Sequence, residues 1–181
     1  MNTPIPCKII DEYFSQNLKA AELLYKGKLH GQLLTILLSA IDIYGFLDSP
    51  VNQSSASGKS FKHWVKKYII VNPGIEYTEL DLWASRCSIL HTHTMESDLS
   101  RNNKAREIAF YSGDKFNPKV SDLEAFIKKT KQDKCVVANI EETYLSFVIS
   151  SESFARDFAK KCECNEVYLL RLNKISHQHT W

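Results

Sequence analysis

An arginine and a histidine near the middle of the chain are the side chains best suited to act together in a reaction. Arg86 and His91 stand five positions apart in the segment RCSILH, and His93 follows two residues later. Histidine can accept or donate a proton near neutral pH, because its ordinary pKa is about 6.5. Arginine stays charged and can bind two phosphate oxygens through its planar guanidinium. The set is therefore chemically suited to a reaction such as RNA cleavage without a metal ion, with histidine moving protons and arginine stabilising the transition state.

The spacing leaves open which histidine works with Arg86. On a regular α-helix, residues five apart point about 140° away from each other, whereas His93 aligns with Arg86 to within about 20°. We expect His91, with His93 as the close alternative; a distorted helix end or a site shared between protomers would relieve the angle. One histidine cannot easily be both acid and base, so a two-fold homodimer would supply the second. The structural alternative is an arginine that caps carbonyls and a histidine at a helix C-terminus.

Other polar residues are candidates for supporting roles. Asp42 lies in an apolar helical segment, where a local buried hydrogen-bond partner is the expected role and holding Arg86 or a histidine is the alternative. Two basic clusters could guide an RNA backbone, although a solvated surface is the more common role of such clusters. The RNA-binding candidates are Lys62, Lys66, Lys67, Arg101 and Lys104, with Arg106 beside the last two.

The elements that must position these residues follow from hydrophobic periodicity. Helices are predicted at about 11–26, 32–47, 61–70, 78–93 and 120–130 and from 141, with a further amphipathic segment at 167–172. Short strands are predicted at 105–111 and 135–140 and are expected to pair. The segment 32–47 is apolar nearly all round, which predicts the most buried helix. The fold class is therefore mainly α: a helical bundle with a small two-stranded β addition.

The predicted helix that carries the motif has two distinct faces. Thr78 and Asp81 form a capping-box pattern at its start. One face is predicted to enter the core, and a second, mixed face is predicted to meet a partner. The core face comprises Leu80, Trp83, Cys87 and Leu90, and the partner face comprises Leu82, Arg86, Ile89 and His93.

The motif and its context resemble a known group of helical domains. The segment LWASRCSILHTHTMESDLSRNNKAREI is similar to the HEPN superfamily, whose members dimerise and carry an R-x4–6-H motif. The resemblance covers about 32–149 in layout, and in residue identity only the stretch around the motif. It implies one HEPN-like domain over 1–181, with a helical core at about 11–94 and a strand, helix, strand and long helix at about 105–176.

The resemblance also implies a function and partners. A HEPN-type protein would be a metal-independent endoribonuclease that acts as a homodimer on RNA, for example in a toxin–antitoxin or phage-defence pair with an antitoxin or regulatory protein. Nuclease members usually carry a polar residue after the arginine, where this chain has Cys87. Cys87 therefore favours the alternative, a catalytically silent RNA- or protein-binding domain, whereas His91 and His93 together favour the enzyme.

Composition sets the remaining bounds. A formal net charge of +2 and a pI near 8.2 neither require nor exclude a nucleic-acid partner. Five scattered cysteines indicate reduced thiols, and no segment resembles a signal peptide or is long enough to cross a membrane, so we expect a cytoplasmic protein. Gly58-Lys59-Ser60 lacks the preceding glycine and strand of a phosphate-binding P-loop. The His-x-His and Cys-x-Cys pairs of the chain lack the spacing of a structural zinc site, so neither metal nor cofactor is expected.

Overall fold

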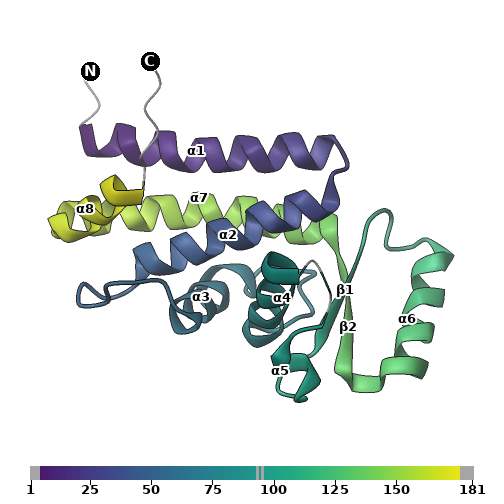
Figure 1. Cartoon of the computed structure of the whole chain (residues 1–181). Coiled ribbons are helices and arrows are strands. Elements are labelled where there is room, and N and C mark those ends of the chain that lie inside the picture. Colours follow the sequence, from purple (N-terminus) through teal and green to yellow (C-terminus); the bar gives the residue numbers. More distant parts are fainter. Residues whose placement is uncertain (1–4, 93, 95, 176–181) are drawn as a thin grey trace.

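Long helices form the body of the molecule, and a small β–α–β unit extends from one end (Figure 1). The structure is a computed structural model that describes residues 5–92, 94 and 96–175. The elements in chain order are α1 (Ile5–Lys26), α2 (His30–Asp48), α3 (Gly58–Trp64), η1 (Val65–Ile69), α4 (Glu79–Thr92), α5 (Asp98–Arg101), β1 (Glu107–Tyr111), α6 (Pro118–Lys131), η2 (Gln132–Lys134), β2 (Cys135–Asn139), α7 (Ile140–Cys164) and α8 (Glu166–Ile175). The predicted class, mainly α with a two-stranded addition, is confirmed.

The central helix is α2, as its apolar sequence predicts. It packs against α1, α3, α4 and α7, and its buried side chains join an aromatic core. Among the described helices, α2 is the one that is long and apolar enough to cross a membrane, but half of that stretch is buried inside the bundle. The helix therefore serves as the core element of the bundle. The aromatic core comprises Phe14, Tyr44, Trp64, Phe147, Phe154 and Phe158.

The predicted helix at 61–70 is two elements in the structure. α3 ends at Trp64 and continues as η1, a π-helix in which the Ile70 N–H donates to the Val65 carbonyl at 3.1 Å. Serines of α7 donate to the last carbonyls of this segment: Ser150 Oγ to Tyr68 O at 2.7 Å, and Ser146 Oγ to Ile69 O at 3.2 Å. These bonds satisfy backbone groups that a helix end leaves without intrahelical partners.

The two predicted strands pair in parallel. β1 and β2 are in register from Glu107 opposite Cys135 to Tyr111 opposite Asn139. Parallel strands need a crossover connection, and α6 supplies it. Figure 1 shows this β–α–β unit beside α4 and α5, at the far end of the molecule from α8. The unit therefore packs beside α4, the helix that carries Arg86 and His91.

The predicted faces of α4 are wrong. Leu82 of the expected partner face is buried at 2% exposure, with Ala84, Ser85 and Ser88 beside it. The expected core face is only half-buried, because α4 lies at the edge of the bundle and its small residues pack inward, where they allow close approach to α2 and β1. The half-buried face comprises Leu80, Trp83, Cys87 and Leu90. Cys87 therefore lies at the surface of the bundle and not in its core.

Candidate functional site

Arg86 is held by an acidic residue of the central helix. Its Nε donates to Asp42 Oδ2 at 2.6 Å, and its Nη2 lies 2.5 Å from the same oxygen. The two side chains are 21% and 14% exposed, so the ion pair is largely shielded from water. Burial raises the pKa of Asp42, while the hydrogen bond and charge of Arg86 act in the opposite direction. The alternative role considered for Asp42, holding Arg86 in place, is the one the structure shows.

The free end of the Arg86 guanidinium reaches His91. The Arg86 Nη1 atom lies 3.4 Å from His91 Nε2, although the two residues are five positions apart on α4. On a regular helix, residues five apart point away from each other, and α4 stays α-helical to Thr92. The length of the arginine side chain nevertheless allows the guanidinium to reach His91. A guanidinium has only donors, so a hydrogen bond between these two atoms requires Nε2 to be the acceptor. His93 lies outside the described residues.

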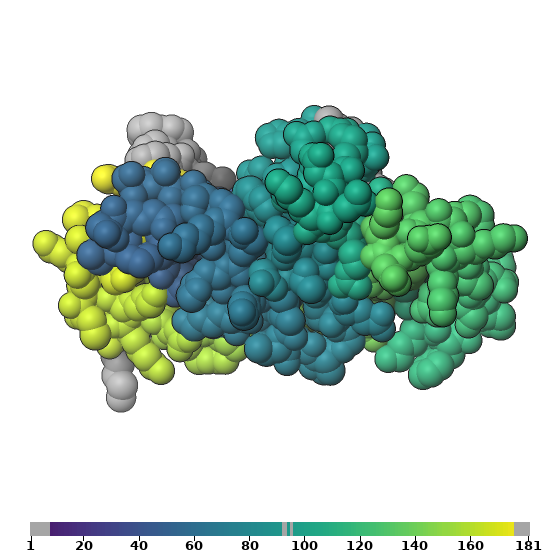
Figure 2. All heavy atoms as spheres, turned by 90° about the horizontal axis from the view of Figure 1, so that it is seen from below, coloured from purple at the N-terminus to yellow at the C-terminus, as the bar shows by residue number. Residues whose placement is uncertain are grey.

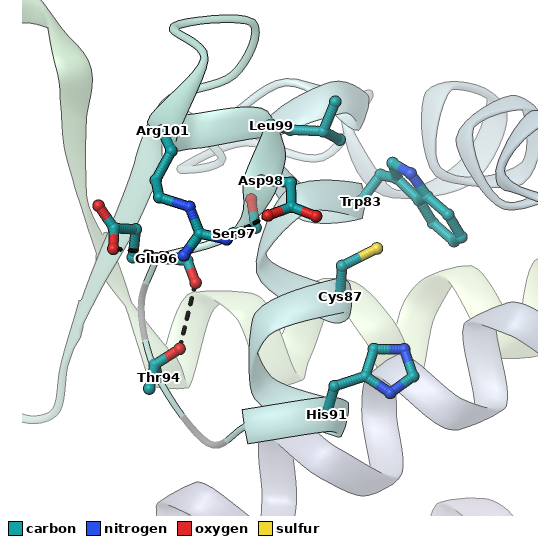
Figure 3. A pocket seen from close by; sticks show the side chains of 9 residues that line it. All are labelled: Trp83, Cys87, His91, Thr94, Glu96, Ser97, Asp98, Leu99 and Arg101. Carbon is teal, nitrogen blue, oxygen red and sulfur yellow. Dashed lines mark hydrogen bonds and ion pairs between the residues drawn. The ribbon is translucent and has the colours of Figure 1, made fainter.

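A pocket of about 550 Å³ opens beside His91. Figure 3 shows Trp83, Cys87 and His91 on successive turns of α4, across from the segment that leads into α5. Two serines fix that segment through a capping box at the start of α5. Arg86 and Asp42 do not line the pocket themselves; the guanidinium instead lies over the Trp83 ring, 5.3 Å from its centroid. The other lining residues are Thr94, Glu96, Ser97, Asp98, Leu99 and Arg101.

The cysteine beside Arg86 lines this pocket but is not suited to attack a substrate. Burial raises the pKa of the Cys87 thiol, and the nearby Arg86 charge opposes this shift only in part. The thiol is therefore protonated at neutral pH, and thiolate is the nucleophilic form. Cys87 instead supplies an apolar part of the pocket wall between Trp83 and His91.

The start of α4 is anchored as the capping box predicts. Thr78 N–H donates to Asp81 Oδ2 at 2.9 Å, and Asp81 N–H donates to Thr78 Oγ1 at 3.2 Å. Arg106, at the entrance to β1, also bonds this carboxylate through its backbone N–H at 2.7 Å and its side-chain Nη2 at 2.8 Å. Burial raises the pKa of Asp81, but these hydrogen bonds together outweigh it and hold the pKa below its usual value. Arg106 thus connects the entrance to β1 with the start of α4, and its charge is already paired with Asp81.

The remaining RNA-binding candidates do not form one surface. Lys62 and Lys66 line a hollow of about 310 Å³ near the start of α4. Lys67 instead lies 3.7 Å from Asp48 and 4.0 Å from Asp157. Arg101, on the pocket wall, is paired with Glu96 at 3.6 Å and with Asp98. Lys104 is exposed on the turn before β1.

Sequence reasoning missed two features of the molecule. The acidic wall of the pocket, Glu96 and Asp98, gave no signal beyond two isolated carboxylates. The buried Asp48 gave none either, because its ion-pair partner Lys161 is 113 residues away and no periodicity links them. Among the described residues, no group of three or more His, Cys, Asp or Glu side chains is arranged to hold a metal ion.

The chain was also compared with known proteins. No family model matches it, and neither the curated proteins nor the solved structures contain a match.

Proposed function

We propose that this protein is a metal-independent endoribonuclease of HEPN type that acts as a homodimer. The observation that supports it is the contact of 3.4 Å between Arg86 Nη1 and His91 Nε2, beside a pocket and with Asp42 holding the arginine from behind. A fixed guanidinium next to an imidazole is the pair that phosphoryl transfer needs when the substrate supplies its own nucleophile.

The proposed reaction uses the 2′-hydroxyl of RNA. When Arg86 Nη1 moves from His91 to the phosphate, His91 Nε2 is free to accept the proton of that hydroxyl, and the resulting oxygen attacks the adjacent phosphorus. The bond from phosphorus to the 5′-oxygen breaks, and this oxygen leaves with a proton supplied by the His91 of a second protomer. Arg86 stabilises the charge on the non-bridging oxygens. The products are a 2′,3′-cyclic phosphate and a 5′-hydroxyl, and DNA is resistant because it lacks the nucleophile.

The proposed homodimer rests on a different face of α4 from the one first predicted. Because Leu82 is buried, it cannot contribute to an interface. Leu80, Trp83, Cys87 and Leu90 recur at intervals of three and four residues and are half-buried in the single chain. This spacing is that of a helix seam that packs on another helix. A two-fold axis along it would bring two copies of His91 towards one cleft.

Two contacts favour the alternative, a silent RNA- or protein-binding domain. Asp42 binds Nε and Nη2 of Arg86 and Nη1 contacts His91, so few of the guanidinium N–H groups remain for a phosphate. Glu96 and Asp98 place carboxylates across the pocket from His91, and these would repel an RNA backbone unless Arg101 neutralises them. In this alternative the domain keeps its binding surface but has no chemical activity.

The proposed cellular setting follows from the same resemblance. A cytoplasmic nuclease of this kind would be controlled by an antitoxin or regulatory protein, in a toxin–antitoxin or phage-defence pair. Expression in growing bacteria tests this part. The wild type is expected to slow growth and His91→Ala to be harmless; equal growth of both would argue against a toxic nuclease.

The enzymatic proposal is tested on purified protein with single-stranded RNA in excess EDTA. We expect cleavage by the wild type and a loss of roughly 10²–10⁴-fold for His91→Ala, because a positioned proton-transfer group contributes about that factor. The matched control for Arg86→Ala is Arg156→Ala, which removes an exposed arginine of α7. His93→Ala decides between the two histidines. Cleavage that survives both Arg86→Ala and His91→Ala would refute the proposed site.

A further inference from the structure

A second pocket, of about 650 Å³, lies at the C-terminal end of α2. It is formed by the last turn of α2, the loop after it, α3 with η1, and the junction of α7 and α8. In the space-filling view of Figure 2, the blue segment that holds this loop lies against the yellow C-terminal helices. The lining residues that matter for its chemistry are Asp48, Lys59, His63, Lys67, Lys161 and Tyr168.

A buried carboxylate organises the base of this pocket. The side chain of Asp48 is 1% exposed, and Lys161 Nζ lies 2.5 Å from its Oδ1 and 2.7 Å from its backbone carbonyl. On the other side, Oδ2 faces Lys67 Nζ at 3.7 Å and His63 Nε2 at 3.9 Å. A buried charge requires a close partner, and Lys161 supplies it. Lys67 and His63 are farther away and remain partly directed at the pocket.

The pocket therefore carries more positive than negative charge. Three lysines line it against one carboxylate, and that carboxylate is already neutralised by Lys161. Lys67 is shared with the half-exposed Asp157 at 4.0 Å. Lys59 makes no ion pair with any residue that the structure describes. The charge left over is available to an anion that enters from solvent.

The wall of the pocket is fixed before any ligand enters. Arg171 is buried at 6% exposure and donates to three carbonyls of the loop after α2: Ser49 at 2.8 Å, Pro50 at 2.7 Å and Gln53 at 2.7 Å. A loop held in this way does not have to be ordered on binding, and such preorganisation favours affinity.

We propose that this pocket binds the phosphate groups of a nucleotide, either a free nucleotide or the 5′-phosphorylated end of an RNA. Lysine ammonium groups bind phosphate as point charges. The volume lies within the range of small-molecule sites and exceeds what inorganic phosphate alone would fill. The Tyr168 side chain and the amides of Asn52 and Gln53 offer an apolar wall and hydrogen-bonding groups for the rest of the nucleotide. This proposal does not depend on cleavage by Arg86 and His91.

The test is a binding titration with three probes: ATP, a short RNA with a 5′-phosphate, and the same RNA with a 5′-hydroxyl. It is carried out on the full-length His91→Ala protein, so that cleavage cannot disturb it. The decisive variant adds Lys59→Ala and Lys67→Ala, which leaves Lys161 on the buried Asp48. Its matched control adds Lys128→Ala and Lys129→Ala on α6, which changes the net charge equally on an exposed helix at the other end of the molecule.

We expect ATP or the 5′-phosphorylated RNA to bind at least about tenfold more weakly to the decisive variant than to its control, because each charged hydrogen bond contributes about that factor. Stronger binding of ATP identifies a free nucleotide as the ligand, and a preference for 5′-phosphate over 5′-hydroxyl RNA identifies an RNA end. No binding of either phosphorylated probe, or an equal loss in the control, would overturn the proposal. Circular dichroism of both variants verifies that they are folded.

Discussion

Two acidic residues of α2 hold cations in different ways. Asp42 meets one arginine, and both are largely enclosed, so the charges balance in a single fixed pair. Asp48, six residues further along the same helix, is almost fully buried and faces two lysines and a histidine. The first arrangement orients a guanidinium towards His91, whereas the second leaves positive charge facing a pocket.

The difference shows that an aspartate can either fix the orientation of one cation or gather several cations that attract an anion. An arginine that is bound by two of its nitrogens has its plane fixed, which suits a group that must meet a developing charge. Lysine ammonium groups around one carboxylate have no planar geometry to orient. Together they create a positive electrostatic potential, which attracts an anion.

The largest effect on stability is expected at Asp48. Asp48→Asn would leave Lys161 without a countercharge and Lys67 with Asp157 alone, and breaking a buried pair in this way costs about 3–5 kcal/mol. Asp42→Asn should cost less, because Asp42 is more exposed and has one partner. Urea unfolding measures both. If the two substitutions are equally destabilising, the two regions do not differ in their contribution to the free energy of unfolding. The double variant Asp48→Leu with Lys161→Met should recover part of the stability lost in Asp48→Asn.

The next effect concerns the plane of the Arg86 guanidinium. Arg86→Lys keeps the charge but cannot bridge from Asp42 to His91, so we expect the cleavage rate to fall roughly 10²–10³-fold with little change in unfolding free energy. Lys67→Arg is the counterpart in the other region and should leave cleavage unchanged, because a spread field does not require one geometry. Full activity of Arg86→Lys would show that charge alone is sufficient.

A smaller, pH-dependent effect is expected at Asp81. It accepts backbone N–H bonds as well as an arginine, which is why its pKa lies below the usual value while that of Asp42 lies above it. The stabilisation by Asp81 is therefore complete above the unfolded-state pKa of about 4 and is lost as the pH falls through the lower folded-state pKa. Asp81→Asn should cost about 1–3 kcal/mol at pH 7 and less at pH 3, as measured by urea unfolding. A cost independent of pH would contradict this account.

The smallest effect concerns the hollow beside α4. If Lys62 and Lys66 contact RNA phosphates, replacing both with alanine should make the logarithmic salt dependence of RNA binding shallower by about 1.4, or about 0.7 per single-strand phosphate. The measurement uses the His91→Ala protein in a salt titration. An unchanged slope would show that these lysines are only solvated surface.

Much of the fold followed from local patterns. The buried α2, the capping box at Thr78 and Asp81 and the pairing of the two strands all depend on residues close in sequence or on a clear period. The sequence paired Arg86 with His91 by residue type but required a distorted helix end or a shared site to relieve the angle, whereas the length of the arginine side chain brings the two together on a regular helix.

What could not be predicted depends on distant partners. On α4, Leu82 and three small residues face inward while Trp83 and Leu90 are only half-buried, which differs from the pattern that hydrophobic size alone suggests. The last carbonyls of η1 accept hydrogen bonds from the hydroxyls of Ser146 and Ser150, far along the chain. The second pocket likewise requires Asp48 and Lys161 to meet across 113 positions. No local period encodes such pairings.

The most direct test of the central proposal is the chemistry of the cleaved end. A defined single-stranded RNA that the wild type cleaves is compared with the same RNA carrying one 2′-deoxy nucleotide on the 5′ side of the cleaved bond, in EDTA, with mass spectrometry of the products. We predict a 2′,3′-cyclic phosphate from the first RNA and no cleavage at that bond in the second, because the substrate must supply the attacking oxygen. Cleavage of the deoxy-substituted bond, or a product with a 5′-phosphate, would contradict a mechanism in which His91 activates the 2′-hydroxyl and Arg86 stabilises the phosphate.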